Sequence, residues 1–181
     1  MKYFISILFT ILIFKTSDIM ECSDFEKLLG KKISNLEEVI GKDFENKYFE
    51  KNYYYIKDET VSKSLNGISF NSISVQSDEK EIVESITIHF LEIINQEFYD
   101  QLIQLYGLPN EIKIIEKKEE ISNKVIKDET FSQEVKKSNI ELRDGSFEEN
   151  PLYVSWKKEN FNVKLFFRHK QGISEITFTK N

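Results

Sequence analysis

The sequence predicts an α+β fold in which short helices pack on antiparallel sheet, with two related α/β units in tandem. Three observations lead to this prediction. First, helix-capping patterns are followed by alternating apolar and polar residues in each half of the chain. Second, YIKDETVS at residues 55–62 returns almost unchanged as VIKDETFS at residues 125–132. Third, two weaker pairs of similar segments, LEEVIG with LIQLYG and VESITI with ISEITF, follow the same order along the chain.

The N-terminus has the pattern of an export signal. Lys2 precedes an apolar run from Tyr3 to Phe14, and Lys15 follows it. A run of about 12 apolar residues behind a basic start is typical of a signal peptide, and it is shorter than the ~20 residues of an ordinary membrane span. We therefore assign residues 1–21 to a signal peptide or lipoprotein signal. The expected location is periplasmic, outer-membrane-tethered or secreted.

Cys22 is the only cysteine, so no intrachain disulfide is possible. It lies where the modified cysteine of a bacterial lipoprotein would lie, which makes it a candidate for lipidation. Glu21 stands where that pattern has a small residue. The alternatives are a cleaved signal with an unmodified cysteine and a retained N-terminal anchor helix. Contact with a membrane is expected only through the N-terminal signal or a lipid anchor.

Residues 22–94 form the first predicted unit, a helical hairpin followed by antiparallel strands. The segments SDFEKLLG and SNLEEVIG each place a serine and a glutamate at capping-box spacing before a glycine, which predicts two short helices. YYYI, GISFNSISV and EIVESITIHF then have the composition or the alternation of strands. Each helix has one apolar side, so we expect both helices to pack on this sheet.

Residues 95–181 form the second predicted unit. Asn95 can cap a helix over QEFYDQLIQLY, and IKIIEK and KVIKDETF are expected to be strands. Residues 132–151 are a polar insertion. Three alternating segments follow, LYVSWK, FNVKLFFR and ISEITFT, and they predict an antiparallel meander.

Composition excludes several classes of function. Lys and Arg total 25 against 31 Asp and Glu, a net charge of −6, which disfavours a nucleic-acid partner. The two histidines lack metal-ligand spacing, and the 6 glycines form no phosphate-binding loop. We therefore predict no metal, no cofactor and no catalytic residue. A hydrolase with two acidic residues on distant strands stays open as an alternative.

Aromatic residues provide the candidate partner-binding site. Consecutive strand residues point to opposite faces, so Tyr53, Tyr54 and Tyr55 must place at least one ring on the outer face of the sheet. Phe166 is expected opposite the apolar face of its strand, with Arg168 beside it. Aromatic and arginine side chains together often anchor protein interfaces. The alternative is that helices or the insertion cover both faces and bury these rings in a core.

LLGKKISNLEEVIG and FYDQLIQLYGLPNEI each combine a short helix, a glycine and a break into strand. In this respect two copies of the unit resemble the β-lactamase inhibitor protein family, and one copy resembles the small outer-membrane assembly lipoproteins of the SmpA/OmlA type. The resemblance implies an exported protein that works by binding, without catalysis. We predict a binding or inhibitory protein of the cell envelope, whose partner is a protein or a small ligand. The alternatives are a secreted hydrolase with a carboxylate pair and an immunity or adhesion factor.

Overall fold

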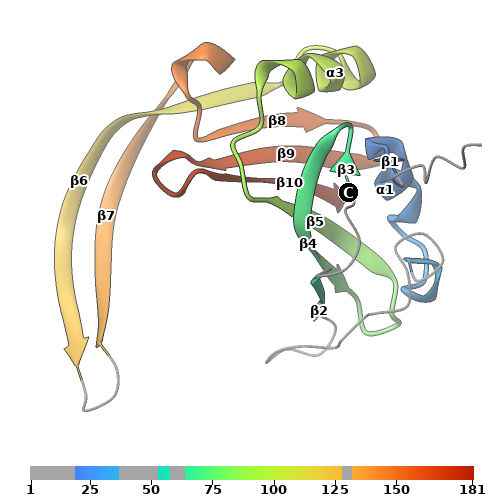
Figure 1. Cartoon of the computed structure of the whole chain (residues 1–181), viewed down its shortest axis with the longest axis horizontal. Helices are drawn as coiled ribbons and strands as arrows, with labels where there is room; N and C mark the ends of the chain where they lie inside the picture. Colours follow the sequence, from blue (N-terminus) through green and yellow to red (C-terminus); the bar gives the residue numbers. More distant parts are fainter. Residues whose placement is uncertain (1–18, 37–52, 58–63, 128–131) are drawn as a thin grey trace, which may run out of the picture.

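The computed structural model describes residues 19–36, 53–57, 64–127 and 132–181. Within these ranges the chain is dominated by strands, which join in one ten-stranded sheet (Figure 1). The helices are α1 (Cys22–Leu28) and α3 (Gln96–Tyr106), with short 3-10 turns at Phe147–Glu149 and His169–Gln171. The strands are β1 (Ile19–Met20), β2 (Tyr53–Lys57), β3 (Ser64–Leu65), β4 (Ile68–Ser77), β5 (Val83–Phe90), β6 (Glu111–Lys127), β7 (Ser132–Asp144), β8 (Tyr153–Lys157), β9 (Phe161–Arg168) and β10 (Ile173–Lys180).

The strand order of the sheet is β1-β3-β4-β5-β10-β9-β8-β6-β7, and β2 also pairs with β4. All pairings are antiparallel except that of β1 with β3. At the centre, β5 from the first half of the chain pairs with β10 from its C-terminal end. The two halves of the sequence therefore contribute to one continuous sheet.

The predicted fold class is wrong. The chain is a β-rich protein with one long, mostly antiparallel sheet, and it is not an α+β protein made of two related α/β units. The IKDET segments also begin in unrelated places. The first follows Tyr55 in β2 and runs out of the described residues, whereas the second lies at the far end of β6. Their similarity does not indicate two copies of one unit, because a strand-forming sequence can occur in any strand of a sheet.

One pair of similar segments does have a structural counterpart. VESITI lies in β5 and ISEITF lies in β10, and these strands are direct neighbours. Thr87 stands opposite Thr177, and their hydroxyl oxygens are 2.9 Å apart. Ile86 and Ile88 stand opposite Phe178 and Ile176, all of them buried. The similar sequences thus meet side by side at the centre of the sheet, where they join the two halves.

Helix α1 differs from its predicted capping. The helix begins at Cys22, so Ser23 lies inside the first turn and its hydroxyl donates to Glu21. Asp24 performs the role expected of Glu26, because its carboxylate accepts from the backbone N–H of Glu21. The second expected helix begins with helical residues 34–36, and the rest of it lies outside the described residues.

Helix α3 confirms its prediction. The Asn95 side chain accepts a 2.9 Å hydrogen bond from the backbone N–H of Phe98, and the helix ends at Gly107 with a φ of 78°. The indole N–H of Trp156 donates to the Gly107 carbonyl over 2.9 Å and so ties the helix end to β8. Phe98 of α3 packs edge-on against Phe90 of β5. In α1, Phe25 stacks on Phe178 of β10.

The long β6–β7 hairpin differs most from the sequence prediction. The sequence predicts two separate strands and then a polar insertion over residues 132–151, but β6 is one 17-residue strand and β7 occupies most of that insertion. Figure 1 shows the hairpin arching away from the rest of the sheet. β6 pairs with β8 only at residues 111–113. Farther out, most described side chains are exposed, so no apolar alternation marks the strands in the sequence.

The two faces of the sheet are different. One face packs on α1 and α3 and carries the buried core, which includes Trp156, Val163, Leu165, Ile86 and Ile88. The other face, which we call the open face, carries polar and aromatic side chains between these apolar positions. The cross-strand row Ser72–His89–Glu175–Phe166–Tyr153 lies on it, and so does the row Tyr55–Ser74–Thr87–Thr177–Lys164.

Candidate binding pocket on the open sheet face

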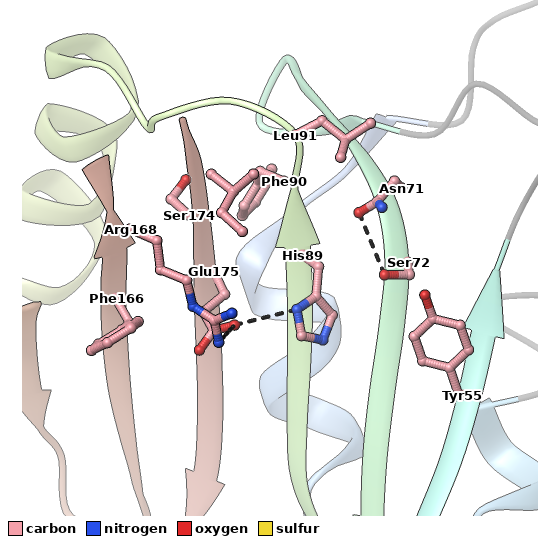
Figure 2. Close-up of a pocket in the computed structure, with 11 residues that line it drawn as sticks. Tyr55, Asn71, Ser72, His89, Phe90, Leu91, Phe166, Arg168, Ser174 and Glu175 are labelled. Atoms are coloured by element: carbon pink, nitrogen blue, oxygen red, sulfur yellow. Dashed lines mark hydrogen bonds and ion pairs between the residues drawn. The ribbon is translucent and has the colours of Figure 1, made fainter. Parts of the chain in front are cut away.

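A pocket of about 310 Å³ lies on the open face near one end of the central strands. Five neighbouring strands, β2, β4, β5, β10 and β9, contribute its walls (Figure 2). The lining residues are Tyr55, Asn71, Ser72, His89, Phe90, Leu91, Phe166, Arg168, Ile173, Ser174 and Glu175. The pocket therefore combines residues from both halves of the chain, which only the β5–β10 pairing brings together.

Three of the five predicted partner-binding residues line this pocket. Tyr55 forms one wall, while Phe166 and Arg168 lie on the opposite side (Figure 2). Tyr54 points to the other face of the sheet and packs against the core. Tyr53 belongs to β2, and its side chain lies outside the described residues. The predicted alternation of β9 is confirmed, because Val163, Leu165 and Phe167 are buried while Phe166 is only half-buried.

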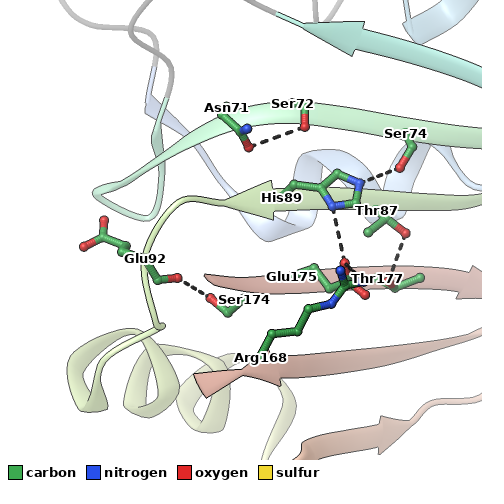
Figure 3. A network of polar contacts seen from close by, with 10 residues as sticks. All are labelled: Asn71, Ser72, Ser74, Thr87, His89, Glu92, Arg168, Ser174, Glu175 and Thr177. Carbon is green, nitrogen blue, oxygen red and sulfur yellow. Dashed lines mark hydrogen bonds and ion pairs between the residues drawn. The ribbon is translucent and has the colours of Figure 1, made fainter. Parts of the chain in front are cut away.

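His89 is the centre of a polar network beside the pocket (Figure 3). Its Nδ1 lies 3.3 Å from Glu175 Oε2, and its Nε2 lies 2.6 Å from the Ser74 hydroxyl. A carboxylate can only accept, so Nδ1 carries the proton and Nε2 accepts from Ser74 in the neutral ring. The hydrogen bond from His89 and the nearby charges of Arg168 and Lys164 hold the pKa of Glu175 below its ordinary value.

The position of Asn71 depends on an irregularity in β4. The register of β4 with β5 shifts between Phe70 and Ser72, so Asn71 is the extra residue of a β-bulge. Bulges redirect side chains and occur often beside functional sites. The Asn71 side-chain oxygen accepts from the Ser72 hydroxyl at 3.4 Å, which leaves its NH₂ group without a partner in the described part of the chain.

Basic and aromatic side chains alternate on the part of the open face that adjoins the pocket. Lys164 lies 4.2 Å from the ring centre of Tyr153, and the Arg168 guanidinium lies 5.9 Å from that of Phe166. These distances are those of cation–π contacts. Arg168 and Lys164 stand against the single carboxylate of Glu175 here, so this part of an acidic protein has a local excess of positive charge.

Ser74, His89 and Glu175 lie in the order of a nucleophile, a base and an orienting acid. The access that catalysis requires is poor, however. Ser74 is 4% exposed and does not line the pocket. It also lies inside β4, between partners in β2 and β5. The geometry favours a network that fixes His89 and Glu175 in place.

Cys22 lies in the core. Its side chain is fully buried, and burial raises the pKa of its thiol to about 12. Asn66 points its amide at the sulfur over 3.8 Å. Residues 1–18 of the predicted signal lie outside the described residues, whereas Ile19 and Met20 form β1, which pairs with β3. Lipidation of Cys22 stays a prediction.

Another pocket, of about 280 Å³, is lined by two carboxylates, Glu26 and Glu159. These two residues are a candidate for the acidic pair of the predicted hydrolase alternative. Burial raises the pKa of Glu26, whose carboxylate accepts a hydrogen bond from the Tyr106 hydroxyl. Across the described ranges, no three His, Cys, Asp or Glu residues gather as a metal site would require. No helix of the described residues is long and apolar enough to cross a membrane.

A comparison of the chain with protein-family models, curated proteins and solved structures finds no match. The resemblance to inhibitor and lipoprotein families stays a prediction. Sequence reasoning missed the His89–Glu175 pair because it treated each histidine alone. The signal was present in the similarity of VESITI and ISEITF, since antiparallel pairing of these segments at their threonines places His89 opposite Glu175.

Proposed function

We propose that the protein is an exported binding or inhibitory protein that holds a protein partner on its open sheet face without catalysis. The observation that carries this proposal is the gathering of Tyr55, Phe166 and Arg168 around one pocket. These residues belong to two strands, β2 and β9, that are distant in sequence. Interface hot spots are typically aromatic and arginine side chains in such central pockets.

The rigidity of the site supports the same proposal. The pocket is built on paired strands, and the His89–Glu175 contact crosses the central strand pair. A binding surface that is already ordered costs less conformational entropy on association. The surrounding Ser, Thr and Lys side chains would form the polar rim that protein interfaces usually have.

Alanine variants of the pocket test this proposal. Phe166→Ala and Tyr55→Ala remove half-buried rings from the open face, so each should shift the melting temperature by only a few degrees. Each should weaken partner binding roughly tenfold or more. Leu108→Ala is the matched control, because Leu108 is exposed in a loop away from the pocket. Equal affinity for wild type and both pocket variants would exclude this surface.

A serine hydrolase is the second candidate function, because Ser74, His89 and Glu175 lie in the order of its triad, although Ser74 is buried. A fluorescent fluorophosphonate would then form a covalent bond to Ser74, and Ser74→Ala would abolish the labelling. Glu175→Gln would slow it, since the orienting carboxylate is lost. The absence of any Ser74-dependent labelling would remove this candidate.

A further inference from the structure

The hydrogen-bonding groups that face the pocket are mostly donors. The Tyr55 hydroxyl has no hydrogen-bond partner among the described residues, and the Asn71 NH₂ group has none either. The Arg168 side chain is 51% exposed, and its Nη2 lies 3.8 Å from Glu175 Oε2. That distance is too long for a hydrogen bond, so the guanidinium keeps its N–H groups available.

The charge around Arg168 is positive. Glu175 is an acceptor, but its Oε2 faces both His89 and Arg168, and its pKa is lowered by these neighbours and by Lys164. Two permanent cations, Arg168 and Lys164, therefore stand against one carboxylate. On the Arg168 side of the pocket, a ligand meets this lining cation and, beside the pocket, Lys164, against the one carboxylate of Glu175. A group with negatively charged acceptor oxygens complements this side.

We propose that the pocket receives the carboxylate of an aspartate or glutamate side chain of the protein partner. Arg168 would bind the carboxylate oxygens through its N–H fork, while Asn71 and Tyr55 on the opposite wall, beyond β10 and β5, would donate to neighbouring polar groups of the partner (Figure 2). Phe166, Leu91 and Ile173 provide apolar contact for the residues next to it. This inference rests on the proposed function, because it names the chemistry by which the same site recognises its partner.

Nuclear magnetic resonance titration of the ¹⁵N-labelled protein tests the inference. The probes are a blocked peptide with glutamate beside phenylalanine, its glutamine counterpart, and N-acetylglutamate. We expect saturable shifts at residues 55, 71 and 168 with the glutamate peptide, and binding at least about tenfold weaker for the glutamine peptide. Weaker binding of N-acetylglutamate than of the glutamate peptide supports a protein side chain as the source. Stronger binding of N-acetylglutamate would overturn that part and indicate a small free acid.

Variants separate the role of Arg168 from unspecific charge. Arg168→Gln should abolish the preference for glutamate, and Arg168→Lys should restore only part of it, because lysine lacks the planar fork. Lys157→Gln is the control, since Lys157 is an exposed cation that pairs with Glu111 outside the pocket. Its preference should be unchanged.

Equal binding of the glutamate and glutamine peptides, or a preference that survives Arg168→Gln, would overturn the inference. The proposed function fails separately, when Phe166→Ala and Tyr55→Ala both leave partner affinity unchanged. If these variants do weaken the partner while no acidic probe binds, the carboxylate assignment is wrong and the binding face remains.

Discussion

At the scale of single residues, His89 connects the two halves of the chain. It lies on β5 and contacts Ser74 of β4 and Glu175 of β10, so its side chain links three neighbouring strands. The sequence predicts a polar face for its strand but not its partners. The missing information is long-range strand pairing, which local alternation cannot supply.

Glu175 should make the stability of the protein depend on acid. Its pKa lies below the ordinary 4.5 because it accepts from His89. Its contribution is therefore present above the pKa of the unfolded chain and is lost as the pH falls through the lower folded-state pKa. Between about pH 5 and pH 3, wild type should lose about 1 kcal/mol more unfolding free energy than Glu175→Gln in urea titrations. Equal losses would show that the contact contributes nothing to folding.

Cys22 should be chemically inert in the folded protein. Its thiol is fully buried and has a pKa of about 12, so almost no thiolate forms at neutral pH. Reaction with Ellman's reagent should be roughly a hundredfold slower in buffer than in denaturant. Rapid reaction of the folded protein would contradict the buried position. If protein from its native cell shows no thiol even in denaturant, Cys22 is modified there.

At the scale of elements, the sequence predicts the elements that bury an apolar side. Helix α3 and strands β5, β8, β9 and β10 all have one apolar face, and each lies where its pattern predicts. The sequence does not predict the β6–β7 hairpin, because the outer parts of both strands have no apolar face to bury. Backbone pairing holds it together, and charged residues such as Lys117 and Glu119 cover it. Charges on an edge strand also oppose pairing with other chains.

The outer hairpin should be dispensable for folding. Past Ile114, which is buried, the strands of the hairpin pair with each other and with no other strand of the described residues. Replacing residues 116–141 by Asn-Gly keeps the pairing of Ile115 with Leu142 across a type I′ turn. The shortened protein should melt within a few degrees of wild type in calorimetry. A loss of cooperative folding would show that the hairpin stabilises the body.

At the scale of the whole molecule, one sheet runs through both halves of the sequence. The β5–β10 pair buries Ile86, Ile88, Ile176 and Phe178 at its centre, so each half exposes an apolar edge without the other. The predicted tandem of α/β units is wrong, because it assigns β5 and β10, which are direct neighbours, to separate sheets. Nothing local in the sequence distinguishes two small sheets from one joined sheet.

This continuity predicts a single unfolding transition. Residues 22–94 and 95–181 expressed separately should each be unfolded or aggregated, because each lacks the neighbour of its central strand. Calorimetry of the intact protein should give equal calorimetric and van't Hoff enthalpies. Two resolved transitions, or a half that folds alone, would mean that the halves are independent domains.

The proposed role of the protein requires that the open face is the binding surface. Site-specific photo-cross-linking tests this directly, with p-benzoylphenylalanine placed at Phe166 in the pocket and at exposed Leu108 as the control. In the protein's native cells, the probe at position 166 should give one discrete cross-linked partner that excess unlabelled protein competes away, while the probe at position 108 should give none. Cross-linking to the same partner from position 108 alone would place the binding surface elsewhere and contradict the account.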